Sequence, residues 1–125
     1  MSKFKEYLKL LPKGIGNFEN IIEGWYNEIK LQNENLPEDE INEILRRRVI
    51  CNQCPLNSVN AQSSKEYKDL YGKSYTTDRP DLHCSCCGCP IVAKTASLSS
   101  DCGLMDYNKE HKDKEQILKW RKYKN

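Results

Sequence analysis

Large apolar residues recur at helical spacing in the first third of the chain. They stand at Ile15, Phe18, Ile22, Trp25 and Ile29, in steps of three or four residues. Such steps place the side chains in one stripe on one side of a helix, so the pattern predicts an amphipathic helix here. We expect the stripe to pack on the protein's own next helix. The alternative is a coiled-coil-like seam with another chain, for which two heptads are short.

A second helix is predicted directly before the first cysteines. Pro37 suits its first turn, and the acidic run from Glu38 to Glu40 suits the positive end of its dipole. Arg46, Arg47 and Arg48 are expected in its last turn, where cations are favoured. We interpret the triplet as complementing the dipole, with phosphate binding as its alternative role. The two helices predict an N-terminal helical hairpin within residues 1–50.

Four further elements follow from local signals. Residues 3–11 predict a short amphipathic helix that ends before Pro12. Ser64 is placed to cap about two helical turns that end at Gly72. Residues 91–93, Ile-Val-Ala, predict a short strand of a zinc-ribbon hairpin. Residues 109–125 are rich in Lys and Arg and predict a basic helix of about three turns that needs a partner to persist.

The cysteines carry the clearest chemical signal. Cys51 and Cys54 form one Cys-x-x-Cys pair, and Cys84 and Cys87 form another after 29 intervening residues. Two such pairs are typical of a tetrahedral thiolate zinc site, in which four cysteines close the coordination sphere. The sequence therefore predicts a structural Zn²⁺ in a zinc-binding module at 51–104, followed by a basic C-terminal segment at 105–125.

Neighbouring cysteines leave the ligand set open. Gly88 follows Cys87 and can adopt the positive φ that a metal-binding turn often requires, which favours Cys84 and Cys87 as the second pair. The overlapping pair of Cys86 and Cys89 is followed by a proline, which has no amide hydrogen to donate. Cys89 and Cys102 are the strongest substitutes, since either could replace Cys84 in a wider loop.

A disulfide framework and an iron–sulfur centre are the alternatives to zinc for these cysteines. A disulfide framework is disfavoured because seven is an odd number and the chain starts Met-Ser-Lys-Phe-Lys-Glu, with no secretory signal. An iron–sulfur centre is the main remaining metal alternative. The leftover cysteines are expected to be buried as small apolar residues, and His83 and His111 to lie on the surface. The alternative is that some of these cysteines complete a second metal site with His83 or His111.

Composition explains why a metal would be needed. The 125 residues are 38% hydrophobic and 30% charged, which is a poor supply of apolar surface for a core. A structural zinc contributes an apparent 10–16 kcal/mol in small modules, roughly a whole domain's stability. The expected fold is mostly α with a small zinc-ribbon or treble-clef-like β element, the helical hairpin being stapled to the four-cysteine zinc module. No stretch approaches the roughly 20 apolar residues of a membrane span.

The cysteine segments also resemble a known group. The motifs are Arg48-Val-Ile-Cys51-x-x-Cys54, Cys84-x-x-Cys87-Gly-Cys89-Pro-Ile-x-x-Lys94 and Cys102. They resemble small zinc-finger proteins of tailed bacteriophages, including crAss-like phages, over roughly residues 46–104. The resemblance implies that all the cysteines except Cys86 are candidate metal-site residues. It also implies a virion component. A Cys-Pro-x-Gly-Lys-Trp ending is expected there, and this chain instead reads Cys-Gly-Leu-Met from Cys102.

The sequence is compatible with three classes of function. The first is a non-enzymatic structural adaptor, a phage virion component at the portal, neck or tail junction, which associates with other chains in a homo- or hetero-oligomeric ring. Its localisation would be the virion or the host cytoplasm, without secretion. The residues expected to contact partners are Ile15, Phe18, Ile22, Trp25, Ile29, Trp120 and Tyr123.

The second class is a zinc-ribbon protein that binds nucleic acid in transcription or DNA packaging. The net charge is only +2, so this alternative rests on local basic residues. They are Arg46, Arg47, Arg48, Lys119, Arg121 and Lys122. An enzyme ranks third, because four cysteines would close the metal site and no phosphate loop, His-Glu-x-x-His or serine elbow occurs in the sequence.

Overall fold

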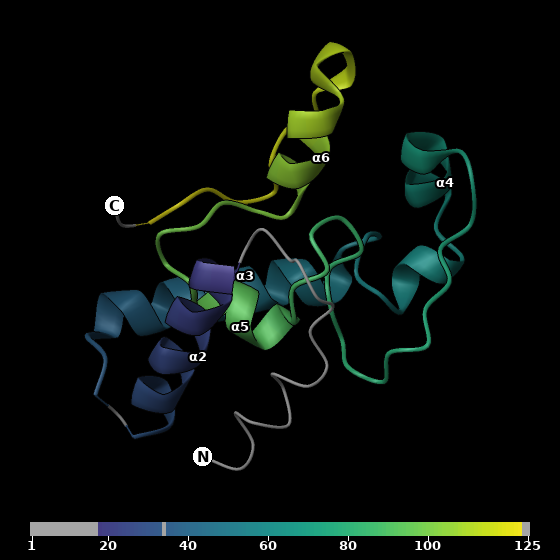
Figure 1. Ribbon diagram of the computed structural model, residues 1–125. Coiled ribbons are helices and arrows are strands. Elements are labelled where there is room, and N and C mark those ends of the chain that lie inside the picture. Colours follow the sequence, from purple (N-terminus) through teal and green to yellow (C-terminus); the bar gives the residue numbers. More distant parts are fainter. Residues whose placement is uncertain (1–17, 34, 124–125) are drawn as a thin grey trace.

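The computed structural model describes residues 18–33 and 35–123, with side chains from Ile21 onward. Figure 1 shows this part of the chain as a mostly helical structure, as the sequence predicts. Its elements are α2 (Phe18–Gln32), α3 (Glu38–Gln53), α4 (Lys65–Tyr71), α5 (Ile91–Ala96) and α6 (Leu104–Glu110), with short 3₁₀ turns at Asn60–Gln62 and Lys112–Lys114. The helix predicted over residues 3–11 lies outside the described residues, as do Ile15 and the side chain of Phe18.

Helices α2 and α3 share α5 as a packing partner (Figure 1). The predicted hairpin differs from this arrangement, since the closest neighbour of α2 is α5, not α3. Arg48 of α3 joins the three helices: its guanidinium pairs with Glu28 of α2 and donates to Thr95 Oγ1 of α5 at 3.1 Å. The buried side of α2 consists of Ile21 and Trp25, which pack with Ala93 of α5.

Close approach of α2 to α5 depends on Gly24. A β-carbon at this position would stand 1.8 Å from the Ala93 carbonyl oxygen. We expect Gly24→Ala to lower the free energy of unfolding by about 1–3 kcal/mol, because the two backbones must move apart. Urea denaturation would measure this.

Gly72→Ala is the matched control for this prediction, since nothing lies within 4 Å of a β-carbon there, although φ is +75°. It should cost only the roughly 1–2 kcal/mol of a left-handed non-glycine residue, with no change in α2–α5 packing. At Gly24, helix propensity alone would make the alanine variant more stable, because alanine is a better helix former than glycine by about 1 kcal/mol.

Any loss of stability in Gly24→Ala must therefore come from the packing of α2 on α5. A Gly24→Ala variant as stable as the wild type would contradict this close packing.

The strand predicted at 91–93 is wrong, because these residues begin helix α5. Pro90 precedes the helix with φ −54° and Thr95 Oγ1 donates back to the Ile91 carbonyl at 2.8 Å. Ile91 and Ala93 are buried, and no neighbouring strand is present in the described chain to pair with them. A helix satisfies its backbone groups internally, so burial overrides the β-propensity of Ile and Val.

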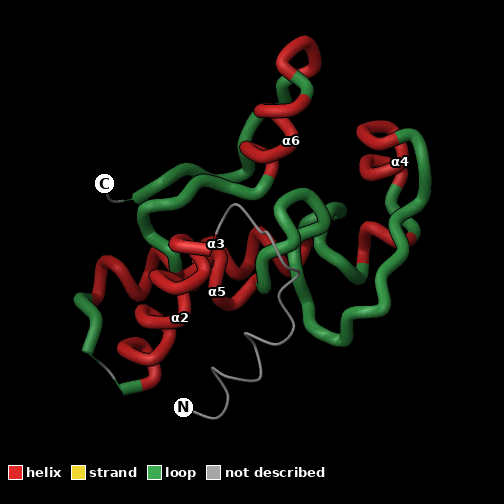
Figure 2. Tube along the Cα trace, viewed as in Figure 1, coloured by secondary structure: helices red, strands yellow, loops and turns green. Residues whose placement is uncertain are grey.

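The expected β element is likewise not formed. Figure 2 shows helices and loops only, and residues 18–33 and 35–123 contain just two isolated antiparallel bridges. One bridge joins Asn57 to Cys84, and the other joins His83 to Pro90. The first holds the two cysteine segments side by side and the second closes the 84–89 turn, without a sheet.

Helix α4 follows its sequence signals closely. The Ser64 hydroxyl accepts a hydrogen bond from the Tyr67 amide at 3.0 Å, which is the predicted N-cap. Gly72 ends the helix in the left-handed conformation at φ +75°. Both local predictions are confirmed.

The C-terminal helix predicted at 109–125 is wrong for most of its length. Helix α6 ends at Glu110, and after Lys112–Lys114 the described chain continues without a helix. This segment instead returns across the molecule (Figure 1), where Tyr123 N donates to the Leu98 carbonyl at 2.8 Å. Cys102 N donates to the Trp120 carbonyl at 3.1 Å. Tertiary hydrogen bonds and the burial of Trp120 outweigh a marginal short helix.

Candidate metal centre

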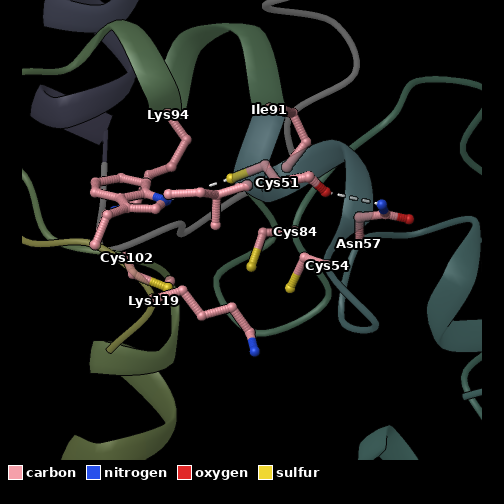
Figure 3. A pocket seen from close by; sticks show the side chains of 11 residues that line it. Cys51, Cys54, Asn57, Cys84, Ile91, Lys94, Cys102 and Lys119 are labelled. Atoms are coloured by element: carbon pink, nitrogen blue, oxygen red, sulfur yellow. Dashed lines mark hydrogen bonds between the residues drawn. The ribbon is translucent and has the colours of Figure 1, made fainter. Parts of the chain in front are cut away.

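Four cysteines from three segments line one small cavity. They are Cys51 and Cys54 at the end of α3, Cys84 in the loop before α5, and Cys102 before α6. Figure 3 shows the four side chains around this space. The cavity has a volume of about 20 Å³, which is room for about one water-sized particle. All seven cysteines lie in the described chain and none forms a disulfide.

The end of α3 positions the first pair. The helix continues through Cys51 and stops at Gln53, so Cys54 lies one residue beyond it. The Asn57 side chain donates to the Cys51 carbonyl at 2.9 Å and holds the turn that follows. The Leu56 amide then donates to Cys54 Sγ at 3.4 Å. Such a bond favours the thiolate over the thiol.

The second cysteine segment is a tight turn. Gly88 adopts φ +75°, as its place after Cys87 predicts, and its amide donates to the Cys84 carbonyl at 2.8 Å. The Cys86 amide donates to Cys84 Sγ at 3.4 Å. Cys87 lies next to Cys84, but it packs with the buried Cys89 against Ile21, Trp25 and Ala93. The turn therefore presents Cys84 to the cavity and buries Cys89 against α2 and α5, while the Cys87 sulfur lies between them, beside Cys84 and Gly103.

Cys102 reaches the cavity because the backbone of the next residue, Gly103, lies unusually close to the sulfurs of Cys84 and Cys87. A β-carbon on Gly103 would stand 2.5 Å from Cys84 Sγ and 2.9 Å from Cys87 Sγ. The Cys102 amide donates to the Trp120 carbonyl at 3.1 Å, which ties this segment to the C-terminal part of the chain. Glycine at 103 is thus what allows the third segment to reach the other two.

Replacing Gly103 with alanine is expected to force the Cys84 turn away from the Cys102 segment. We expect a loss of about 1–3 kcal/mol in the free energy of unfolding, as for other overpacked sites. Thiol titration under native conditions should also show faster modification of the cysteines. In the open Gly72→Ala control the thiol reaction rates should stay at the wild-type value, and unchanged rates in Gly103→Ala would contradict the proposed contact.

Burial favours the neutral thiol form of Cys51 until a cation binds. Burial raises the pKa of the Cys51 thiol to about 12, although the Trp120 indole N–H donates to its sulfur at 3.4 Å. A buried thiol of this kind ionises only when a cation replaces its proton. Lys94 and Lys119 also line the cavity, and Lys119 Nζ additionally reaches Glu66 at 3.5 Å.

The donor set fits a thiophilic metal ion. Within residues 18–33 and 35–123, no three His, Cys, Asp or Glu side chains stand close enough together to hold a metal ion as the structure has them. The sulfurs would therefore draw in around an ion. Four cysteine donors at a one-particle cavity suit zinc chemistry, and neither a histidine nor a carboxylate lines it.

The predicted partner residues fall in different environments. Trp25 is buried against α5, Ile29 is half-buried, and Ile22 is 37% exposed on α2. Trp120 is buried beside Cys51, where it lines the cysteine cavity. Tyr123 is 42% exposed and its hydroxyl donates to Asp39 at 2.9 Å.

The arginine triplet is not in a last helical turn, because α3 extends to Gln53. Arg47 is fully buried, Arg48 pairs with Glu28, and Arg46 pairs with Glu43 at 2.9 Å. All three guanidiniums therefore pair within the fold, and of the three only the Arg46 side chain is mostly exposed, at 53%. Of the other basic residues weighed for nucleic acid, Lys119 lines the cysteine cavity, whereas Arg121 and Lys122 are exposed.

Several residues of the site were not found by sequence reasoning. Lys94, Asn57 and Gly103 gave no sign of their roles, because each depends on contacts between distant segments. His83, expected on the surface, is fully buried, and the Tyr75 hydroxyl lies 2.6 Å from its Nε2. The sequence signal that could have indicated the burial of His83 is its position directly before Cys84.

No family model, curated protein or solved structure matches this chain. The fold and the site together define a small helical protein whose distant segments meet at a cluster of cysteines. Within the described chain, no helix is both long and apolar enough to cross a bilayer.

Proposed function

We propose that this chain is a non-enzymatic structural adaptor whose fold is stapled by a cysteine-bound Zn²⁺. The observation that carries the proposal is the convergence of four cysteines from three segments on one cavity. Thiolates alone would close the coordination sphere, and a closed site suits a structural metal, since a catalytic zinc keeps a position open. The cysteines would hold the ion, and the ion would hold α3, the 84–89 turn and the start of α6 together.

Exposed apolar side chains support association with other protein chains. Tyr26 on α2 is 59% exposed, Leu45 and Val49 on α3 are 49% and 57% exposed, and Ile117 in the C-terminal segment is 88% exposed. Leu45 and Val49 are four residues apart and so lie on one side of α3. The resemblance to phage zinc-finger proteins adds a setting to the proposal: a virion component at the portal, neck or tail junction, in a homo- or hetero-oligomeric ring.

Native mass spectrometry of the purified chain, with metal content measured on the same sample, tests the proposal. We expect about one zinc per chain and a defined oligomer or a stable complex with other particle proteins. The matched control is Leu45→Glu/Val49→Glu, which should weaken association and keep the metal. A metal-free chain, or a loaded one that stays monomeric and enters no particle, would overturn the proposal.

A nucleic-acid-binding function is the second candidate, and one surface feature favours it. An open groove of about 270 Å³ lies between α6 and the C-terminal segment, and Lys109, Lys112 and Arg121 line it together with Glu115. Gel-shift assays at two salt concentrations would detect this activity, because phosphate contacts make affinity fall steeply with salt. A lack of binding at low salt would exclude it.

A further inference from the structure

We propose that the fourth ligand of the metal is Cys102, which completes a set of Cys51, Cys54, Cys84 and Cys102 around a single divalent ion. This inference rests on the proposed function and specifies its site. The sequence pattern alone favours Cys87, which completes the second Cys-x-x-Cys pair. In the structure, by contrast, Cys102 lines the cavity and Cys87 does not.

The first observation is how the sulfurs are divided between two cores. Cys51 and Cys102 belong to one core with Leu56 and Trp120, and Cys54 and Cys84 pack against it. Cys87 and Cys89 instead pack in the core that joins α2 to α5. The cavity is lined by the first four cysteines and not by Cys87 or Cys89. By this division Cys102 lines the space for the ion, whereas Cys87 packs in the neighbouring core.

The second observation is how hydrogen bonds hold the set in place. Cys54 and Cys84 each accept from the amide two residues later, at 3.4 Å in both cases. Cys102 is held through its own amide, which donates to the Trp120 carbonyl at 3.1 Å. Cys51, inside the helix, accepts from the Trp120 indole at 3.4 Å. Such outer-sphere donors orient metal ligands and stabilise their negative charge.

The third observation is the balance of charge and volume. One divalent ion with four thiolates carries a net charge of −2, which the buried Lys94 on the same cavity offsets in part, whereas Lys119 on this cavity also pairs with Glu66 at 3.5 Å. A cavity of about 20 Å³ has room for one ion, whereas an iron–sulfur cluster of several iron and sulfide atoms needs more. The site is thus suited to one thiophilic divalent cation.

The test compares Cys102→Ser with Cys87→Ser, its matched control, by competition for Zn²⁺ with a chromophoric chelator. Loss of an outer-sphere group costs about 10–100-fold in metal affinity, so loss of a ligand should cost more than about 100-fold in Cys102→Ser. Cys87→Ser should lose about tenfold or less. The reverse order, or equal losses, would overturn the assignment.

A measurement on the wild type keeps the test valid if a variant fails to fold. In the Cd²⁺-loaded chain, NMR couplings between the metal and the cysteine β-protons should identify Cys51, Cys54, Cys84 and Cys102. Coupling to Cys87 in place of Cys102 would overturn this inference and leave the zinc staple standing. A wild type that binds neither Zn²⁺ nor Cd²⁺ would overturn the proposed function itself. Iron with acid-labile sulfide in the purified protein would overturn the single-ion site.

Discussion

Stripping the metal with a high-affinity chelator is expected to unfold the region between the end of α3 and the C-terminal segment. Structural zinc contributes an apparent 10–16 kcal/mol in small modules, which is about the whole net stability of a typical domain. Helix α3, the 84–89 turn and Trp120 meet at the cysteine cavity. When its sulfurs separate, all three lose their contacts with one another. Hydrogen exchange should show lost protection at 51–57, 84–91 and 102–107.

Circular dichroism with and without the chelator measures the same effect, and added Zn²⁺ should restore the folded signal. The matched control is Cys51→Ser/Cys54→Ser, which removes one pair of ligands. It should resemble the stripped wild type from the start and respond to neither chelator nor Zn²⁺. A chain shown to be free of metal that keeps its melting temperature and exchange protection would refute the staple.

Replacing Arg47 with methionine is expected to lower the free energy of unfolding by about 3–5 kcal/mol, as for other broken buried ion pairs. Arg47 has no exposed surface, and its guanidinium donates to the carbonyls of Ser97 at 2.9 Å and Arg121 at 3.0 Å. It also pairs with Glu43 at 2.9 Å and lies 4.3 Å from the centre of the Trp120 ring. Methionine fills similar space but leaves these acceptors without a donor.

Arg46→Met is the matched control, because Arg46 pairs with the same Glu43 at 2.9 Å from a side chain that is 53% exposed. An exposed pair contributes about 0–1 kcal/mol, so this variant should lose no more than that. Urea denaturation of both metal-loaded variants gives the comparison. Equal losses in the two variants would contradict the structural role of Arg47.

The Arg47 site also links the C-terminal segment to the cysteine cavity. Trp120 lies between the guanidinium of Arg47 and the sulfur of Cys51, which its indole N–H reaches at 3.4 Å. Loss of Arg47 should therefore loosen the segment whose Trp120 donates to Cys51 and accepts from the Cys102 amide. In Arg47→Met, Zn²⁺ affinity is expected to fall by about 10–100-fold, as for other outer-sphere changes.

Local sequence signals predicted the elements whose formation needs only neighbouring residues. The apolar spacing predicted α2, Pro37 with its acidic followers predicted the start of α3, and Ser64 and Gly72 predicted the bounds of α4. Caps, turns and helical stripes act over a few residues, so the sequence carries them directly. The two cysteine segments were recognised for the same reason, since thiol spacing is a local property.

Tertiary structure decided everything that depends on distant partners. Residues 91–93 form helix in place of strand because they are buried against α2 and α3, and the basic tail is not helical because Trp120 must reach Cys51, 69 residues away. Arg47 was predicted to complement a dipole and instead fills the core, since its carbonyl acceptors come from 95–98 and 121. The place of Cys102 at the cavity depends likewise on the contact of Gly103 with Cys84. Sequence alone thus identified the cysteines as candidate metal ligands, and only the packing of separate segments determined which of them share one cavity.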